Sequence, residues 1–221
     1  MRIAARPDGV ELVPPVGNRD RVRGSWDAPV TLVEFGHYDC PFTVRAFSVV
    51  RGLRRRLGGR LRFVFRVFPL TRIHAHAQAA AEAAEAAAAQ GQFWEMHDRL
   101  FEAHRKLEDA DLRHYAEEVG LDIERFEKEM EDHTHAARVR EDLKSGLSSG
   151  VPGTPTFFIN GVRHDGPNDF ETLLAALEAT PGEAARDPSA GYRGIGAAAD
   201  RRASLNNTTW YSYKRQGRHQ L

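Results

Sequence analysis

The chain reads TLVEFGHYDCPFT from Thr31 to Thr43, where an apolar run of strand type gives way to the start of a helix. Cys40 falls at this turn, is the only cysteine among 221 residues, and is followed directly by Pro41. Proline suits the first turn of a helix, so we expect the sulfur to face the helix N-terminus. Unpaired amide hydrogens and aligned peptide dipoles favour an anion there. Thiolates in such places have pKa values of roughly 3.5 to 7.5, which predicts a nucleophilic sulfur at neutral pH.

The residue three positions after Cys40 is Thr43, where a dithiol motif would carry its second cysteine. In such a motif the second thiol attacks a mixed disulfide and releases the bound partner, and Thr43 cannot do this. Its hydroxyl is predicted to donate a hydrogen bond to the Cys40 thiolate. Because the chain has one cysteine, an outside thiol must resolve any covalent adduct on Cys40.

His37 lies three residues before Cys40 and has two interpretations. As an imidazolium it would pair with the thiolate and lower the pKa of the thiol further. Alternatively, it is a solvent-exposed loop histidine. The spacing does not give the direction of the ring, so both interpretations stay open.

The composition limits the function classes that the chain fits. Lysine plus arginine number 31 and aspartate plus glutamate also number 31, so net charge gives no support for a nucleic-acid or membrane-surface role. We expect no nucleic-acid partner. A single cysteine excludes an internal disulfide framework, and the first residues lack the apolar core of a signal peptide. No run reaches the roughly 20 apolar residues that span a bilayer. We therefore expect a cytoplasmic location and no membrane span.

The periodicity along the chain predicts mixed α/β structure. Residues 31–35 and 61–67 have strand patterns, and a helical pattern runs from 41 to about 57. Two strands joined by a helix form a βαβ unit, whose strands are normally parallel. The alanine-rich segment 75–150 predicts four or five helices. A strand at 155–159, a hairpin turn at Asn160–Gly161 and a helix at 170–179 follow.

These patterns predict one folded domain at 29–180, with a helical insertion at about 74–150. Residues 1–28 are interpreted as an extended lead-in, and residues 181–221 are predicted to be a disordered tail.

Histidines two residues apart do not share a face of a helix, and a zinc site needs further converging ligands. We therefore expect no metal site at the two pairs of this kind, His74 with His76 and His133 with His135.

Four motifs carry a resemblance to a known family. They are LVEF at 32–35, DCPF at 39–42, FWEMH at 93–97 and VPGTPTFFING at 151–161. Their order resembles the thioredoxin fold in its DsbA-like form, over about residues 28–179. The fold class implied is α/β, with an all-helical insertion between the second sheet strand and the cis-proline strand. The chain is also similar to thioredoxin-like domains fused to sodium/proton antiporters.

The resemblance implies a set of site residues around Cys40. It implies that Pro155 is cis and that Thr154 lies beside the sulfur, where its backbone can pair with an extended peptide or a thiol tripeptide. The predicted substrate-binding residues are Pro41, Phe42, Thr154 and Pro155. Enzymatic chemistry requires that the sulfur is reachable from water and that Pro155 lies near it.

Glu34 matches the buried acid that the family holds beneath the cysteine. A carboxyl desolvated under a sheet has a raised pKa and suits proton exchange near neutral pH. The alternative is a glutamate at a solvent-facing strand end, because acids are rarely buried without a partner. The predicted catalytic residues are Cys40, Glu34, Thr43 and His37.

The leading hypothesis is a DsbA-like thiol-disulfide oxidoreductase with a monothiol active site, acting through mixed disulfides that an external thiol resolves. One alternative is a glutathione-dependent transferase or isomerase of kappa type, in which Cys40 only orients the cofactor. Another is a redox-inactive peptide-binding module. No tightly bound cofactor is expected, and a low-molecular-weight thiol such as glutathione is the expected co-substrate. The expected partners are protein or small-molecule thiols and disulfides, and the oligomeric state is left open.

Overall fold

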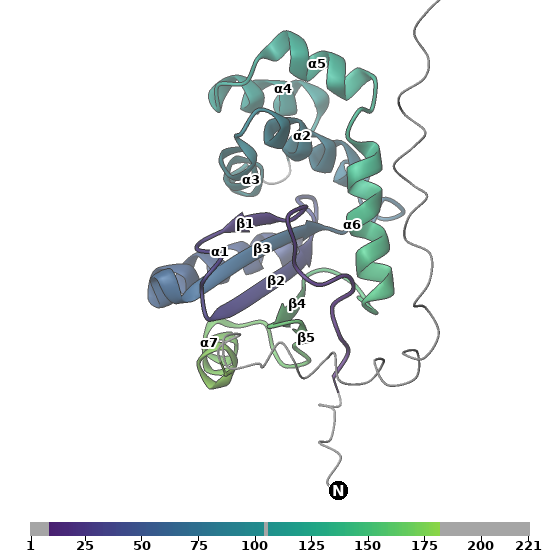
Figure 1. Ribbon diagram of the computed structural model, residues 1–221. Helices are drawn as coiled ribbons and strands as arrows, with labels where there is room; N and C mark the ends of the chain where they lie inside the picture. The colour runs from purple at the N-terminus through teal and green to yellow at the C-terminus, as the bar shows by residue number, and fades with distance from the viewer. Residues whose placement is uncertain (1–8, 104–105, 182–221) are drawn as a thin grey trace, which may run out of the picture. The chain divides into compact units, whose positions relative to one another are not determined.

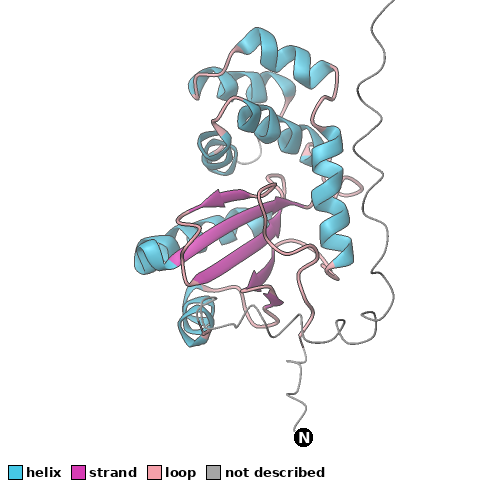
Figure 2. Ribbon diagram, in the orientation of Figure 1, coloured by secondary structure: helices cyan, strands magenta, loops and turns pink. Residues whose placement is uncertain are grey.

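The computed structural model describes residues 9–103 and 106–181, which contain five strands, seven α-helices and one short 3-10 helix, Gly58–Arg60. Figures 1 and 2 show their arrangement. The strands are β1 Arg21–Arg23, β2 Val30–Gly36, β3 Leu61–Val67, β4 Thr156–Ile159 and β5 Val162–Arg163. The helices are α1 Pro41–Leu57, α2 Ala77–Ala89, α3 Phe93–Glu102, α4 Asp109–Glu118, α5 Ile123–Glu131, α6 Ala136–Ser148 and α7 Phe170–Ala179.

The five strands form one sheet in the order β1-β3-β2-β4-β5. The central pair, β2 and β3, is parallel and fully buried, as the βαβ interpretation predicts, and α1 makes the crossover between them. The other neighbouring strands are antiparallel. The predicted α/β class and the helical insertion between β3 and β4 are confirmed.

Side chains alternate between the two faces of the sheet, as the two-residue period of a strand requires. Leu32, Phe65 and Phe157 join the larger hydrophobic core with residues of α1, α7 and the helical insertion. Val33 and Phe158 belong to a smaller core on the opposite face, against which Leu143 of α6 packs. Both faces of the sheet are therefore covered, and the site must lie at a strand end.

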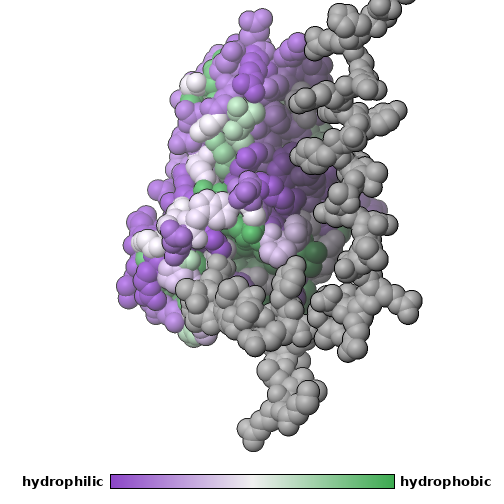
Figure 3. Space-filling model, viewed as in Figure 1, coloured by the Kyte–Doolittle hydropathy of each residue, from purple (hydrophilic) through white to green (hydrophobic). Residues whose placement is uncertain are grey.

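The helical insertion consists of α2 to α6 and is centred on α2. Seven of the alanines of α2 are buried, which lets neighbouring helices approach it closely: Ala77, Ala80, Ala81, Ala83, Ala84, Ala86 and Ala87. Helix α3 carries the FWEMH motif and buries Phe93, Met96 and His97. The prediction of four or five helices is confirmed, with five. On the face shown in Figure 3, hydrophilic residues cover most of the described helices.

Strand β1 was not predicted and lies inside the segment interpreted as an extended lead-in. It pairs antiparallel with β3, and Arg21 lies opposite Phe65. Three residues, two of them arginines, give no alternating apolar pattern for sequence analysis to recognise. The sheet therefore begins earlier in the chain than the sequence predicted.

The segment before β1 is also attached to the sheet through a buried ion pair. Arg66 of β3 and Asp20 are both buried, with 2.7 Å between Nε and Oδ1 and 3.0 Å between Nη2 and Oδ2. Arg66 also donates to Ser145 Oγ of α6 at 2.8 Å. The paired geometry is the strong, two-bond form of an arginine–carboxylate interaction. Arg66 thus joins the early segment, the sheet and the insertion.

The hairpin predicted at Asn160–Gly161 is confirmed and joins β4 to β5. Both residues have positive φ angles, 46° and 82°, as a two-residue type I′ turn requires. The closing helix α7 begins after Asp169, whose side chain accepts from the Thr172 amide. Among the described helices, none is long and apolar enough to cross a bilayer. Apart from its first residue, the segment predicted as a disordered tail lies outside the described residues.

Candidate functional site

Cys40 lies at the N-terminus of α1, as the sequence predicts. Strand β2 ends at Gly36, three residues form the turn, and Cys40 is the N-cap residue of the helix, with extended φ and ψ angles of −90° and 117°. Its carbonyl accepts from Val44 N at 2.9 Å, which is the first helical bond. No side-chain group caps the helix, so the sulfur is close to the positive end of the helix dipole without a competing anion on the cap.

The loop that precedes β4 lies against Cys40. The Thr154–Pro155 peptide bond is cis, and Cys40 Sγ is 3.5 Å from the carbonyl oxygen of Thr154. The pairing of β2 with β4 places Phe35 opposite Thr156 and so brings this loop to the end of β2. The structure therefore unites the cysteine with the Thr154–Pro155 segment, which lies 114 residues further along the chain.

The exposure of Cys40 differs from that of an open surface thiol. Only 3% of the residue is exposed, because the turn before α1 and the Thr154 loop enclose it. The next two residues, Pro41 and Phe42, are exposed, Phe42 to 59%. The structure therefore leaves little of Cys40 in contact with water, although the helix residues that follow it are exposed.

Glu34 is buried beneath this site. It is 2% exposed, pairs within the sheet with Phe65 and Phe157, and its Oε1 atom has no hydrogen-bond partner among the described residues. Burial first, and the nearby charge of Cys40 second, raise the pKa of Glu34 from 4.5 to about 8. The alternative of a solvent-facing strand end is therefore wrong. At neutral pH the carboxyl holds its proton and can exchange it.

Thr43 is fully buried, but its hydroxyl is not bonded to the sulfur. Within the described part of the chain, Thr43 Oγ1 has no hydrogen-bond partner. A Cβ added at Gly36 would lie 2.5 Å from the Thr43 methyl carbon, so this side chain packs against β2. The predicted hydrogen bond from Thr43 to the thiolate is absent from the structure, because packing fixes the side chain in another direction.

His37 fits neither of its two sequence interpretations. It is 0% exposed, which excludes a solvated loop histidine, and neither ring nitrogen has a partner among the described residues. Burial first, and the neighbouring His74 second, lower the pKa of His37 from 6.5 to about 4. The ring is therefore neutral at neutral pH, and the imidazolium interpretation is also wrong.

Sequence analysis did not place His74 near Cys40. The His37 and His74 ring centroids are 4.8 Å apart, and one ligand atom each of His37, Cys40 and His74 lie within 4.8 Å of one another. The expectation of no metal site at His74 and His76 assumes that both lie on a helix. Helix α2 starts at Ala77, so His74 belongs to the preceding loop, where the argument from helix faces does not apply.

Two hydrogen bonds join the turn before Cys40 to the helical insertion. The Tyr38 hydroxyl lies 3.3 Å from Nδ1 of His97 in α3, and both side chains are buried. The Asp39 carboxylate accepts from the backbone N–H of His76 at 3.2 Å. Burial raises the pKa of Tyr38 and lowers the pKa of His97 well away from their ordinary values, so both are neutral. The last residue of the FWEMH motif, His97, thus helps to hold the turn that precedes Cys40.

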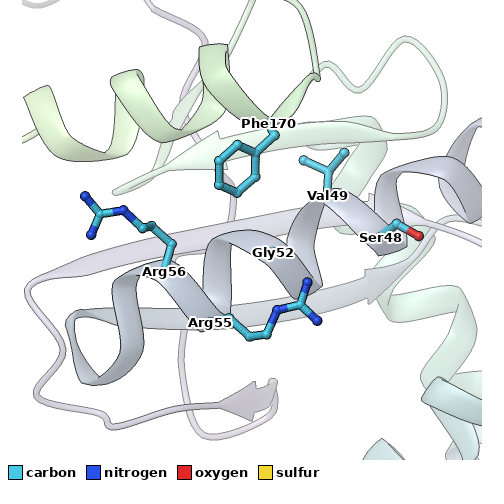
Figure 4. A pocket seen from close by; sticks show the side chains of 6 residues that line it. All are labelled: Ser48, Val49, Gly52, Arg55, Arg56 and Phe170. Atoms are coloured by element: carbon cyan, nitrogen blue, oxygen red, sulfur yellow. The ribbon is translucent and has the colours of Figure 1, made fainter.

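A separate groove lies between α1 and α7 (Figure 4). It is open, has a volume of about 570 Å³, and contains none of the predicted site residues. Figure 4 shows the Phe170 ring of α7 above α1, with two arginines on the helix below it. The lining residues are Ser48, Val49, Gly52, Arg55, Arg56 and Phe170.

Comparison with known proteins agrees with the fold. The family model described as Thioredoxin matches residues 17–179, a span that includes β1. Among solved structures, BdbD from Bacillus subtilis has a TM-score of 0.70 at 24% identity, covering 78% of this chain and 97% of that one. A thioredoxin-like oxidoreductase from Silicibacter pomeroyi has a TM-score of 0.65 at 30% identity, covering 73% and 92%. Alpha-DsbA1 from Wolbachia pipientis has a TM-score of 0.64 at 20% identity, covering 76% and 92%.

The curated relatives are longer proteins. A protein of Salinispora tropica named Na(+)/H(+) antiporter NhaA 3 is 45% identical over 183 residues, which are 82% of this chain and 28% of that protein. The chain thus spans just over a quarter of this relative. The expected similarity to a thioredoxin-like domain within antiporter-named proteins is confirmed, and the name describes the longer proteins.

Proposed function

The chain belongs to the thioredoxin family in its DsbA-like form, and on this premise we propose that it is a thiol-disulfide oxidoreductase with a monothiol active site at Cys40. One observation carries the proposal: the sulfur lies at the N-terminus of α1, 3.5 Å from the Thr154 carbonyl oxygen. A helix N-terminus stabilises a thiolate, and the thiolate is the form that attacks a disulfide.

The reaction has two exchange steps. In the first, the Cys40 thiolate attacks a disulfide, a new bond forms between Cys40 and one sulfur, and the other sulfur leaves as a thiolate. In the second, an external thiolate attacks the sulfur of the bound group, and Cys40 leaves as a thiolate. The net change is that the external thiol is oxidised into a new mixed disulfide, while the sulfur that left in the first step is reduced to a thiolate. Glutathione or an equivalent small thiol is the proposed external reductant, since the chain has no second cysteine.

Glu34 is proposed to move the proton in these steps. Its pKa of about 8 leaves it protonated at neutral pH but close to its titration point. A group with a pKa near the operating pH both gives and accepts a proton readily. The carboxyl can therefore donate its proton to a departing thiolate and accept a proton from an incoming thiol.

The substrate is proposed to dock over Phe42 and the Thr154 loop. Pro41 and Phe42 are exposed, and the Arg45 guanidinium lies 4.6 Å from the centre of the Phe42 ring. Thr154 and Pro155 are half-buried, and the Thr154 carbonyl oxygen is 3.5 Å from the sulfur. An extended peptide or a small disulfide laid between them would bring its sulfur to Cys40. The proposed partners are protein or small-molecule thiols and disulfides, in a cytoplasmic setting where small thiols are abundant.

The 3% exposure of Cys40 favours one other function, a redox-inactive module that binds peptides at the same surface. The exchange proposal is tested by incubating the full chain with oxidised glutathione and measuring its mass. We expect one glutathionyl group on Cys40, which reduced glutathione removes, and no adduct on Cys40→Ser. A native chain that stays unmodified while the urea-unfolded chain reacts would favour the binding module. Glutathione-dependent turnover retained by Cys40→Ser would favour the kappa-type reaction.

The place of Thr43 gives a second test of the same site. Thr43→Cys places a thiol three residues after Cys40. Because cysteine lacks the methyl group that packs against Gly36, its sulfur can turn toward Cys40, and we expect it to displace glutathione from Cys40 and form an internal disulfide. Thr43→Ser is the matched control, because it is small and polar but has no thiol. The measurement is release of reduced glutathione from the preformed adduct without added thiol. Equal release from the two variants would contradict the arrangement.

A further inference from the structure

Three side chains that bind metal ions in proteins meet at the turn before α1. They are His37 and Cys40, both buried, and the half-buried His74, and their ligand atoms lie within 4.8 Å of one another. His37 and Cys40 belong to the turn between β2 and α1, whereas His74 belongs to the loop between β3 and α2. The exchange reaction proposed above uses only the sulfur of this group.

His37 gives an independent indication that a ligand belongs here. Its ring is 0% exposed, and within the described residues neither Nδ1 nor Nε2 has a hydrogen-bond partner. Buried polar groups in folded proteins are nearly always bonded, because an unmet one costs free energy. A neutral imidazole has one nitrogen lone pair available, and that lone pair is what a metal ion binds.

We propose that His37, Cys40 and His74 bind a zinc ion, with its fourth position open to water or to a substrate thiol. One thiolate and two imidazoles are ligands that zinc takes, and three protein ligands are typical of zinc sites with an open position. Calcium and magnesium prefer oxygen ligands and do not suit this set. On binding, the Cys40 thiol releases its proton to solvent and a Zn–S bond forms.

The geometry requires a modest contraction. Bond lengths of about 2.0–2.1 Å to nitrogen and about 2.3 Å to sulfur place tetrahedral ligand atoms roughly 3.3–3.6 Å apart. The present separations reach up to 4.8 Å. His74 is half-buried on a loop, so its side chain has the freedom to approach, whereas His37 and Cys40 are held by their surroundings.

Zinc bound here would engage the Cys40 sulfur, which is the atom that attacks a disulfide in the proposed reaction. The inference does not depend on the exchange activity, since a redox-inactive chain with the same three ligands would also bind the ion. If both hold, zinc inhibits exchange and a chelator restores it.

The test uses the full chain without an affinity tag, freed of metal with a chelator. Co²⁺ is the spectroscopic probe, because thiolate ligation gives a sulfur-to-cobalt charge-transfer band and tetrahedral ligation gives intense visible bands. We expect one Co²⁺ per chain, displaced by one Zn²⁺. Cys40→Ser should lose the charge-transfer band, and His74→Ala should bind Zn²⁺ at least tenfold more weakly in competition with a coloured chelator.

His76→Ala is the matched control. His76 lies two residues after His74, is also half-buried, and lies 3.6 Å from Glu108 instead of belonging to the cluster. It should bind Zn²⁺ as the unmodified chain does. The half-buried His74 is the variant to use because replacing the fully buried His37 also tests folding, and circular dichroism must match for each variant. The proposal is overturned if the unmodified chain gives no charge-transfer band, or if His76→Ala weakens binding as much as His74→Ala.

Discussion

At the scale of single residues, two buried titratable groups beside Cys40 have opposite effects on stability. The pKa of Glu34 is raised to about 8 and that of His37 is lowered to about 4, in each case mainly by burial. Burial disfavours the charged form of each group, so the folded chain holds a proton on Glu34 and lacks one on His37 at neutral pH. Both groups are therefore neutral at neutral pH.

The linkage between these pKa values and folding gives a pH prediction. The contribution of Glu34 is present below about pH 4.5 and is lost as pH rises to about 8, because only the folded chain keeps the proton. His37 acts in the opposite direction between about pH 4 and 6.5. From pH 6.5 to 8 the loss from Glu34 exceeds the small remaining gain from the buried histidines His37 and His97, and the free energy of unfolding should fall by about 1 kcal/mol.

Urea denaturation at pH 6.5 and pH 8, with a chelator present, measures this fall. Glu34→Gln should remove most of it, because the amide is neutral throughout. Glu124→Gln, at an exposed position of α5, should leave it unchanged. A fall of the same size in Glu34→Gln would show that another group is responsible.

At the scale of elements, α6 approaches the sheet closely at a glycine. A Cβ added at Gly146 would lie 2.4 Å from Phe68 Cδ2 and 3.2 Å from Phe35 Cδ1. Both rings are buried in the smaller core and contact each other edge to face. The missing side chain at Gly146 is therefore what lets the helix cover this face of the sheet.

Gly146→Ala should destabilise the chain, although alanine favours a helix. The gain in helix propensity is about 1 kcal/mol, while forcing a methyl group against two packed rings costs about 1–3 kcal/mol. We expect a net loss of up to about 2 kcal/mol in the free energy of unfolding, measured by urea denaturation. Ser148→Ala, at an exposed position of the same helix, should change it by less than about 0.5 kcal/mol. A more stable Gly146→Ala variant would contradict the close approach.

At the scale of the whole molecule, the buried pair of Asp20 and Arg66 holds the segment before β1 to the rest of the fold. Arg66 bonds Asp20 and the Pro14 carbonyl in that segment and Ser145 in α6, so it joins the segment and the helical insertion to its own strand, β3. A fully buried arginine without its carboxylate would carry an uncompensated charge, which is costly.

Asp20→Ala should lower the free energy of unfolding by about 3–5 kcal/mol. Glu102→Ala removes an exposed partner of Arg51 and should cost less than about 1 kcal/mol. Thermal or urea unfolding of the two variants gives the comparison. Similar losses in both would mean that the buried pair contributes no more than a surface one.

The sequence predicts the central elements of the molecule because their signals are local. The alternating strand at 61–67, the Cys40–Pro41 turn and the Asn160–Gly161 hairpin each follow from a few adjacent residues. Strand β1 could not be predicted, since three residues carry no periodicity.

The surroundings of Cys40 depend on contacts between distant segments, and most of the errors fall there. The His37 ring lies against that of His74 from another loop, and Thr43 turns its methyl group toward Gly36. Neither contact leaves a pattern in adjacent residues. The burial of Glu34 was implied by resemblance, because its own position in the strand allows either a buried or an exposed side chain.

The two hydrogen bonds that hold Tyr38 and Asp39 to the helical insertion have a mechanical consequence. These residues directly precede Cys40. The turn that carries the sulfur is therefore bonded to α3 and to the residue just before α2, and it continues from strand β2 of the sheet. A partner that displaced the helical insertion would also displace Tyr38 and Asp39 through these bonds. Movement of a distant helical surface would therefore change the position of the Cys40 thiol.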